Sequence, residues 1–119
     1  MADLHSVFLS LRAILLPYAG QLLVRRDEAS EFYLDTRHVQ ENQQPLFFAA
    51  VQVRKSAVSF HLMPVYLHPA LLQGLSQGLK RRMQGKSCFN FKAGEPALFA
   101  ELEALVEAGF ARYRALGYV

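Results

Sequence analysis

The chain begins with a helical pattern of hydrophobic positions. Apolar residues recur three or four positions apart, as on one face of an amphipathic helix: Leu4, Val7, Phe8, Leu11, Ile14 and Leu15. Asp3 precedes them and is a residue type that caps helix N-termini. Pro17 and Gly20 interrupt the pattern. The sequence therefore predicts a first helix over about residues 3–18.

Alternation with a period of two then predicts four strands. The first two cover residues 21–26 and 31–35 and are separated by a polar turn at 27–30. Residues 36–44 are polar without a period, which indicates an exposed loop that ends at Pro45. The strongest strands cover residues 46–53 and 57–63, and the short link between them predicts a hairpin.

The last third of the chain predicts a further strand between two helical segments. Pro64 ends the hairpin, and Pro69 begins a short helical segment that ends near Gly85. Residues 86–92 form the fifth strand, and Pro96 opens the longest helix, which ends near Leu116. The order α-β-β-β-β-α-β-α predicts one α+β domain over residues 1–119. It is a two-layer sandwich with a mainly antiparallel sheet of about five strands and the helices on one face.

Strand alternation also assigns side chains to the two faces of this sheet. We expect Val58, Phe60, Leu62, Phe89 and Phe91 to lie under the helices. The opposite face then carries a mixed set of side chains: Tyr33, Phe48, Gln52, Ser59, His61, Met63, Cys88 and Asn90. Such a face can be an ordinary solvated surface, a dimer or protein interface, or the floor of a ligand site.

Composition and charge narrow the class of protein. Hydrophobic residues make up 52% of the 119 residues and charged residues 19%, which is typical of a folded globular domain. The formal charge of +3 is small for a nucleic-acid-binding protein. The N-terminal residues lack a basic signal-peptide start, and no apolar run reaches the ~18 residues that a membrane span requires. We therefore expect a cytoplasmic protein with no membrane or nucleic-acid partner.

The densest chemistry lies between residues 80 and 91. Three consecutive basic residues, Lys80, Arg81 and Arg82, precede Gly85 and Lys86. Arginine binds phosphate and carboxylate groups bidentately, and glycine lets the backbone approach a ligand closely. The alternative is a solvated helix end, where positive charge is favoured by the helix dipole. The anion-binding hypothesis assigns the ligand to a site that includes Arg81, Arg82, Lys86, Cys88, Asn90, His61 and Tyr33.

The same segment offers one cysteine, which invites two other interpretations. His61, His68 and Cys88 are the only set of soft metal ligands, but their spacing matches no metal motif. Cys88 is a weak candidate nucleophile. Its pKa could be lowered by Lys86 and by the Arg81-Arg82 pair, and His61 could serve as its base. We expect a protein without enzymatic activity, metal or cofactor.

Residues 44–113 resemble the YdhG-like family, a bacterial group of domains whose functions are mostly unknown. The resemblance rests on ordered pieces: Pro45–Val51, Val58–Pro64, a proline-containing helix, Gly85–Phe91 and the helix that follows Glu95-Pro96. It implies a compact α+β domain similar to frataxin, and one branch of the family is associated with iron delivery. Frataxin-type iron surfaces are acidic, whereas the first predicted helix here offers only Asp3.

We therefore predict a non-enzymatic bacterial domain that binds a small anionic ligand or a protein partner. The protein partner is either another protein or a second copy of this chain. The alternative function, implied by the resemblance, is an intracellular iron or metal chaperone.

Overall fold

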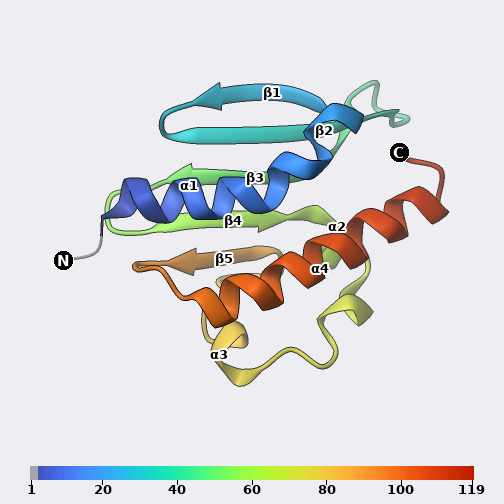
Figure 1. The fold of residues 1–119 in the computed structure, drawn as a ribbon. Coiled ribbons are helices and arrows are strands. Elements are labelled where there is room, and N and C mark those ends of the chain that lie inside the picture. Colours follow the sequence, from blue (N-terminus) through green and yellow to red (C-terminus); the bar gives the residue numbers. More distant parts are fainter. Residues whose placement is uncertain (1–2) are drawn as a thin grey trace.

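The computed structural model describes residues 3–119 (Figure 1). Its elements follow the predicted order, with short helical turns added: α1 (Leu4–Leu15), η1 (Leu16–Gln21), β1 (Leu23–Glu28), β2 (Glu31–Val39), β3 (Pro45–Val53), β4 (Val58–Leu62), α2 (Met63–Leu67), η2 (Pro69–Leu72), α3 (Gln77–Lys80), β5 (Cys88–Phe91) and α4 (Pro96–Ala115).

The five strands form one antiparallel sheet in the order β1-β2-β3-β4-β5. Helices α1 and α4 lie side by side against one face of this sheet (Figure 1). The predicted fold class, a two-layer α+β sandwich with a mainly antiparallel sheet, is confirmed. We call the opposite face of the sheet the open face. Strands that follow one another in the sequence are neighbours in the sheet. Short turns connect β1 to β4, whereas the connection from β4 to β5 runs through α2, η2 and α3.

Helix α1 forms where the sequence predicts it. The Asp3 carboxylate caps its first turn by accepting hydrogen bonds from the His5 backbone N–H (3.0 Å) and the Ser6 hydroxyl (2.9 Å). The α-helix ends at Leu15, and the chain continues to Gln21 as a tighter 3₁₀ helix through Pro17. The predicted helix end at residue 18 therefore falls inside this 3₁₀ segment.

The hydrophobic core lies between the two helices and the sheet. The five residues predicted to face the helices, Val58, Phe60, Leu62, Phe89 and Phe91, are all fully buried, which confirms their assignment. Helix α4 adds Leu102, Val106 and Tyr113, and the Tyr113 hydroxyl donates a 2.9 Å hydrogen bond to the Phe47 carbonyl. This bond ties the end of α4 to the start of β3.

Strands β1 and β2 differ from their predicted boundaries. Strand β1 runs to Glu28, so the turn between the strands is only Ala29-Ser30. The prediction of an exposed loop over residues 36–44 is wrong for its first part, because β2 continues to Val39 and Thr36 is fully buried. The Thr36 hydroxyl donates a 2.9 Å hydrogen bond to the Leu46 carbonyl, which allows a polar residue to continue a buried strand.

Two residues predicted for the mixed face lie elsewhere. Phe48 is fully buried and contacts Phe110 and Tyr113 of α4, because a β-bulge interrupts the alternation of β3 between Phe47 and Ala49. Phe47 takes the place on the open face. Met63 begins helix α2 and therefore has no strand position.

Within the described residues 3–119, none of the helices combines the length and the hydropathy that crossing a bilayer requires.

Candidate functional site

Two rows of side chains cross the open face. The strand register places Tyr33, Ala50, His61 and Cys88 in one row, and Glu31, Gln52, Ser59 and Asn90 in the next. The alternation predicted from the sequence is therefore correct for Tyr33, Gln52, Ser59, His61, Cys88 and Asn90. The open face carries a polar network rather than an apolar patch.

Asn90 is the central residue of this network. Its side-chain oxygen accepts a hydrogen bond from the Ser59 hydroxyl at 2.7 Å, and its amide nitrogen donates to the side-chain oxygen of Gln84. Both ends of the Asn90 side chain are thus held. The Gln84–Asn90 pair stands between two hollows, because both residues line each of them.

The first hollow, the His61 pocket, lies on the open face and measures about 490 Å³. It is lined by Arg54, Ser56, Ala57, Ser59, His61, Gln84, Cys88 and Asn90. The Cys88 sulfur lies 4.0 Å from His61 Nε2 and 3.6 Å from the Asn90 side-chain oxygen. Two of the predicted site residues, His61 and Cys88, are therefore brought together.

The electrostatics of the His61 pocket oppose a cysteine nucleophile. Burial raises the pKa of the Cys88 thiol, and this effect exceeds the opposing influence of Ser59 and Arg54. Burial likewise lowers the pKa of His61, with a further contribution from Arg54. A protonated thiol beside a neutral imidazole is a poor nucleophile and a soft but incomplete metal-ligand pair. His68 ends helix α2 and does not line this pocket.

Over residues 3–119, no three His, Cys, Asp or Glu side chains cluster closely enough to hold a metal ion. The geometry thus provides two soft donors, Cys88 and His61, and no third.

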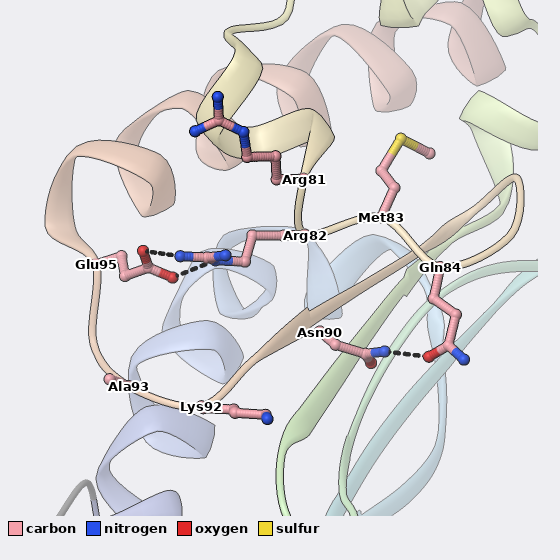
Figure 2. A pocket seen from close by; sticks show the side chains of 8 residues that line it. All are labelled: Arg81, Arg82, Met83, Gln84, Asn90, Lys92, Ala93 and Glu95. Atoms are coloured by element: carbon pink, nitrogen blue, oxygen red, sulfur yellow. Dashed lines mark hydrogen bonds and ion pairs between the residues drawn. The ribbon is translucent and has the colours of Figure 1, made fainter.

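The second hollow, which we call the α3–β5 groove, contains the basic segment (Figure 2). It measures about 570 Å³ and is lined by Arg81, Arg82, Met83, Gln84, Asn90, Lys92, Ala93 and Glu95. The predicted basic helix is short, because α3 ends at Lys80, and the chain then runs beside the outer edge of β5. The Asn90 N–H donates to the Arg82 carbonyl (2.7 Å), and the Gln84 N–H donates to the Cys88 carbonyl (2.9 Å).

Arg82 already has an anionic partner in this groove. Its Nε and Nη2 donate hydrogen bonds of 2.7 and 2.6 Å to the two carboxylate oxygens of Glu95, as Figure 2 shows. The Arg82 hydrogen bond is the main cause that lowers the pKa of Glu95. This bidentate pair fastens the basic segment to the start of α4. The main role of Arg82 is therefore to hold the basic segment against the start of α4.

The remaining cations of the groove are Arg81 and Lys92. Both are exposed, and within the described part of the chain neither forms a salt bridge. In Figure 2, Lys92 extends from β5 below the Arg82–Glu95 pair, and Arg81 stands at the upper rim with its guanidinium turned away from that pair. With Arg82 and Glu95 included, the lining carries a formal charge of +2.

The structure does not gather all seven predicted ligand residues into one site. Arg81, Arg82 and Asn90 line the α3–β5 groove, and His61, Cys88 and Asn90 line the His61 pocket. Tyr33 lies on the same open face but lines a third hollow, which is nearer the β1 edge of the sheet. Lys86 is exposed in the turn after Gly85, whose φ of +81° suits glycine, and it lines none of the three hollows.

Sequence reasoning missed five lining residues of the α3–β5 groove, of which three are polar or charged: Gln84, Lys92 and Glu95. Lys92 follows Asn90 by two positions, so strand alternation pointed to it. Glu95 could not be found in this way, because its pairing with Arg82 depends on where α4 starts relative to α3.

Comparisons with known proteins found no matching family model, no matching curated protein and no matching solved structure. The resemblance to the YdhG-like family therefore stays a prediction.

Proposed function

We propose that this domain binds a small anion, such as phosphate or a carboxylate, in the α3–β5 groove. The observation that carries the proposal is the charge of the groove: Glu95 balances only Arg82, which leaves Arg81 and Lys92 without an acidic partner among residues 3–119. Unbalanced cations beside a concave surface attract anions.

The polar groups beside these cations support the same ligand class. The Gln84 side-chain oxygen accepts from Asn90, so the Gln84 amide nitrogen stays available as a donor (Figure 2). Arg82 uses Nε and Nη2 for Glu95, which leaves its Nη1 hydrogens for another acceptor. An anion in the groove would thus meet charged and neutral N–H donors together.

The other predicted functions receive less support. A metal chaperone would have the two donors Cys88 and His61, whose Sγ and Nε2 atoms lie 4.0 Å apart. Burial raises the pKa of Cys88 and so favours the protonated thiol, which is a poorer metal ligand than the thiolate. A protein partner remains compatible with the exposed groove, and an acidic side chain of such a partner would use the same cations.

Thermal unfolding in phosphate and in a dicarboxylate such as malonate, against chloride at equal ionic strength, tests the proposal. An anion that binds the folded state raises the unfolding midpoint by mass action. Exposed charges are screened by salt, so we expect a dissociation constant in the millimolar range at low ionic strength. Lys92→Ala and Arg81→Ala should each reduce the gain.

Lys86→Ala is the matched control, because Lys86 is exposed on the same segment but does not line the groove. It should keep the full anion effect. Glu95→Gln should strengthen anion binding, because it removes the competing carboxylate from Arg82. A midpoint that no anion raises, or an equal loss in Lys86→Ala, would refute the proposed site.

A further inference from the structure

The third hollow lies where two β-bulges meet on either side of β2. In β1, Val24 pairs with Leu34 and Arg26 with Tyr33, so Arg25 is the extra residue. In β3, Ala49 pairs with Leu34 and Phe47 with Asp35, so Phe48 is the extra residue. Bulges re-aim side chains and are frequent beside functional sites. We call this hollow the bulge pocket.

The bulge pocket measures about 460 Å³ and combines aromatic and charged side chains: Arg25, Arg26, Glu31, Tyr33, Asp35, Gln44, Pro45 and Phe47. The rings of Tyr33 and Phe47 are stacked, with centroids 4.8 Å apart and an interplanar angle of 29°. The bulge in β3 creates this stack, because regular alternation would have turned Phe47 toward the helices.

Asp35 is the unusual residue of the pocket. It is only 7% exposed, and within residues 3–119 no donor gives its carboxylate a hydrogen bond. The two other buried polar residues, Thr36 and Ser59, both donate one. Burial raises the pKa of Asp35, and Arg25 only partly opposes this effect. Among residues 3–119 no fully buried side-chain oxygen lacks a hydrogen-bond partner, so the Asp35 carboxylate oxygens still reach the solvent of the pocket. An ionised group that has lost most of its hydration normally recovers it through hydrogen bonds, and a ligand in the pocket can supply them.

Within the described residues, the cation that pairs with Asp35 is Arg25, and it is a loose partner. Arg25 Nε lies 3.8 Å from the carboxylate, beyond hydrogen-bond distance, and the Arg25 side chain is 52% exposed. The other charged groups are Arg26, whose guanidinium is shared between Glu28 (3.2 Å) and Glu31 (3.5 Å), and Glu31 itself. Arg25 can therefore move into solvent without breaking a hydrogen bond.

We propose that the bulge pocket binds a small organic cation, an alkylammonium or guanidinium compound, with Asp35 as its anionic ligand and the Tyr33–Phe47 pair as its platform. Such a cation supplies the N–H donors that Asp35 lacks and displaces Arg25. Its positive charge or its aliphatic stem packs on the aromatic faces. Glu31 adds a second carboxylate at the same pocket. This site is separate from the α3–β5 groove.

Isothermal titration with agmatine, which carries a guanidinium and an amine but no carboxylate, tests this proposal on the full chain. Asp35→Asn should weaken agmatine binding by at least about tenfold, as expected for loss of a charged hydrogen bond. Arg25→Ala should strengthen binding, because it removes the competing internal cation. Asp27→Asn is the matched control, since Asp27 lies on β1 but pairs with Arg12 of α1 at 2.9 Å; it should bind agmatine normally.

Stability measurements distinguish weaker agmatine binding from loss of the fold. Asp35→Asn removes a desolvated charge, so its unfolding midpoint at neutral pH should equal or exceed that of the wild type, and weaker binding cannot then be attributed to unfolding. Lys92→Ala should bind agmatine normally, so failure of the anion site leaves this result unaffected.

Several outcomes would overturn the proposal. The first is that millimolar agmatine gives no heat of binding. The second is that Asp35→Asn binds agmatine as tightly as the wild type, and the third is that Arg25→Ala loses binding. Binding of free arginine without binding of agmatine would assign the pocket to a carboxylate held by Arg25 and Arg26. Binding of a blocked arginine-containing peptide without binding of agmatine would assign it to a protein partner.

Discussion

Gly109 allows helix α4 to pack closely on α2. It is buried in the middle of α4, and a Cβ atom at this position would lie 2.9 Å from Cβ and 3.1 Å from Cγ of Pro64. Distances this short require a neighbour to move, and the proline ring cannot change rotamer to make room. Glycine is therefore required here by contact rather than by backbone conformation.

Gly109→Ala tests this interpretation, because its two effects have opposite signs. Helix propensity alone would raise the free energy of unfolding by about 1 kcal/mol. Overpacking costs about 1–3 kcal/mol, so we expect a net loss of up to about 2 kcal/mol. Urea unfolding measures the difference. A more stable Gly109→Ala variant would show that α4 and Pro64 can separate without cost.

Asp35 and Arg82 show that residue type alone does not define a site. Arg82 is the more conspicuous residue in the sequence, yet its charge is balanced by Glu95 at 2.6 Å. Asp35 is inconspicuous, yet it is nearly buried, and within residues 3–119 only the loosely placed Arg25 pairs with its carboxylate. The two residues differ in how well an opposite charge balances their own, and the balancing charge comes from another element in each case.

At the scale of elements, strand β3 shows where alternation holds and where it fails. From Ala49 to Val53 the register with β4 is regular, so the predicted faces are correct. Before Ala49 the bulge inserts Phe48, and the predicted faces of Phe47 and Phe48 are exchanged. A strand pattern with apolar residues at Leu46, Phe47 and Phe48 contains no signal for this bulge, because every one of them suits a buried position.

The two faces of β4 provide an energetic test of the fold. Phe60 lies in the core, opposite Val51 and Phe89 in the register, whereas the neighbouring His61 is partly exposed on the open face. Phe60→Ala should lower the free energy of unfolding by roughly 3–5 kcal/mol. His61→Ala should cost about 1 kcal/mol or less. Chemical denaturation of both variants measures this, and equal losses would mean that the open face is covered in solution.

At the scale of the whole molecule, burial makes stability depend on pH. His61 has its pKa lowered below its usual value of 6.5. The folded state then binds fewer protons than the unfolded state. The contribution of neutral His61 to the free energy of unfolding is therefore fully present above pH 6.5 and is lost as the pH falls through the folded pKa. The effect of Asp35 on stability has the opposite pH dependence. Its pKa in the folded state is raised above 3.8, so the free energy of unfolding falls as the pH rises through that folded-state pKa.

The wild type should therefore lose stability between about pH 7.5 and about pH 5.5, the interval around the unfolded pKa of histidine. His61→Gln should lose less over the same interval, and Asp35→Asn should keep the His61-dependent loss. Urea midpoints at the two pH values provide the measurement. An unchanged pH dependence in His61→Gln would assign the titration to other groups.

The hydrophobic pattern of the chain is sufficient to define the class of fold. Helical and strand periods identified the two long helices, the order of the elements along the chain and the core residues Val58, Phe60, Leu62, Phe89 and Phe91, because local periodicity follows directly from which face of each element is buried. The sequence also places Arg81, Arg82 and Asn90 in one neighbourhood, since a single short segment carries them.

The partners and the burial of these residues follow only from the tertiary structure. The Arg82–Glu95 pair depends on the approach of α4 to the segment after α3, and the bulge pocket depends on two register shifts on either side of β2. The near-burial of Asp35 depends on both neighbouring strands. Each of these features is set by how one element is placed against another, and the periodicity within an element carries no information about that placement.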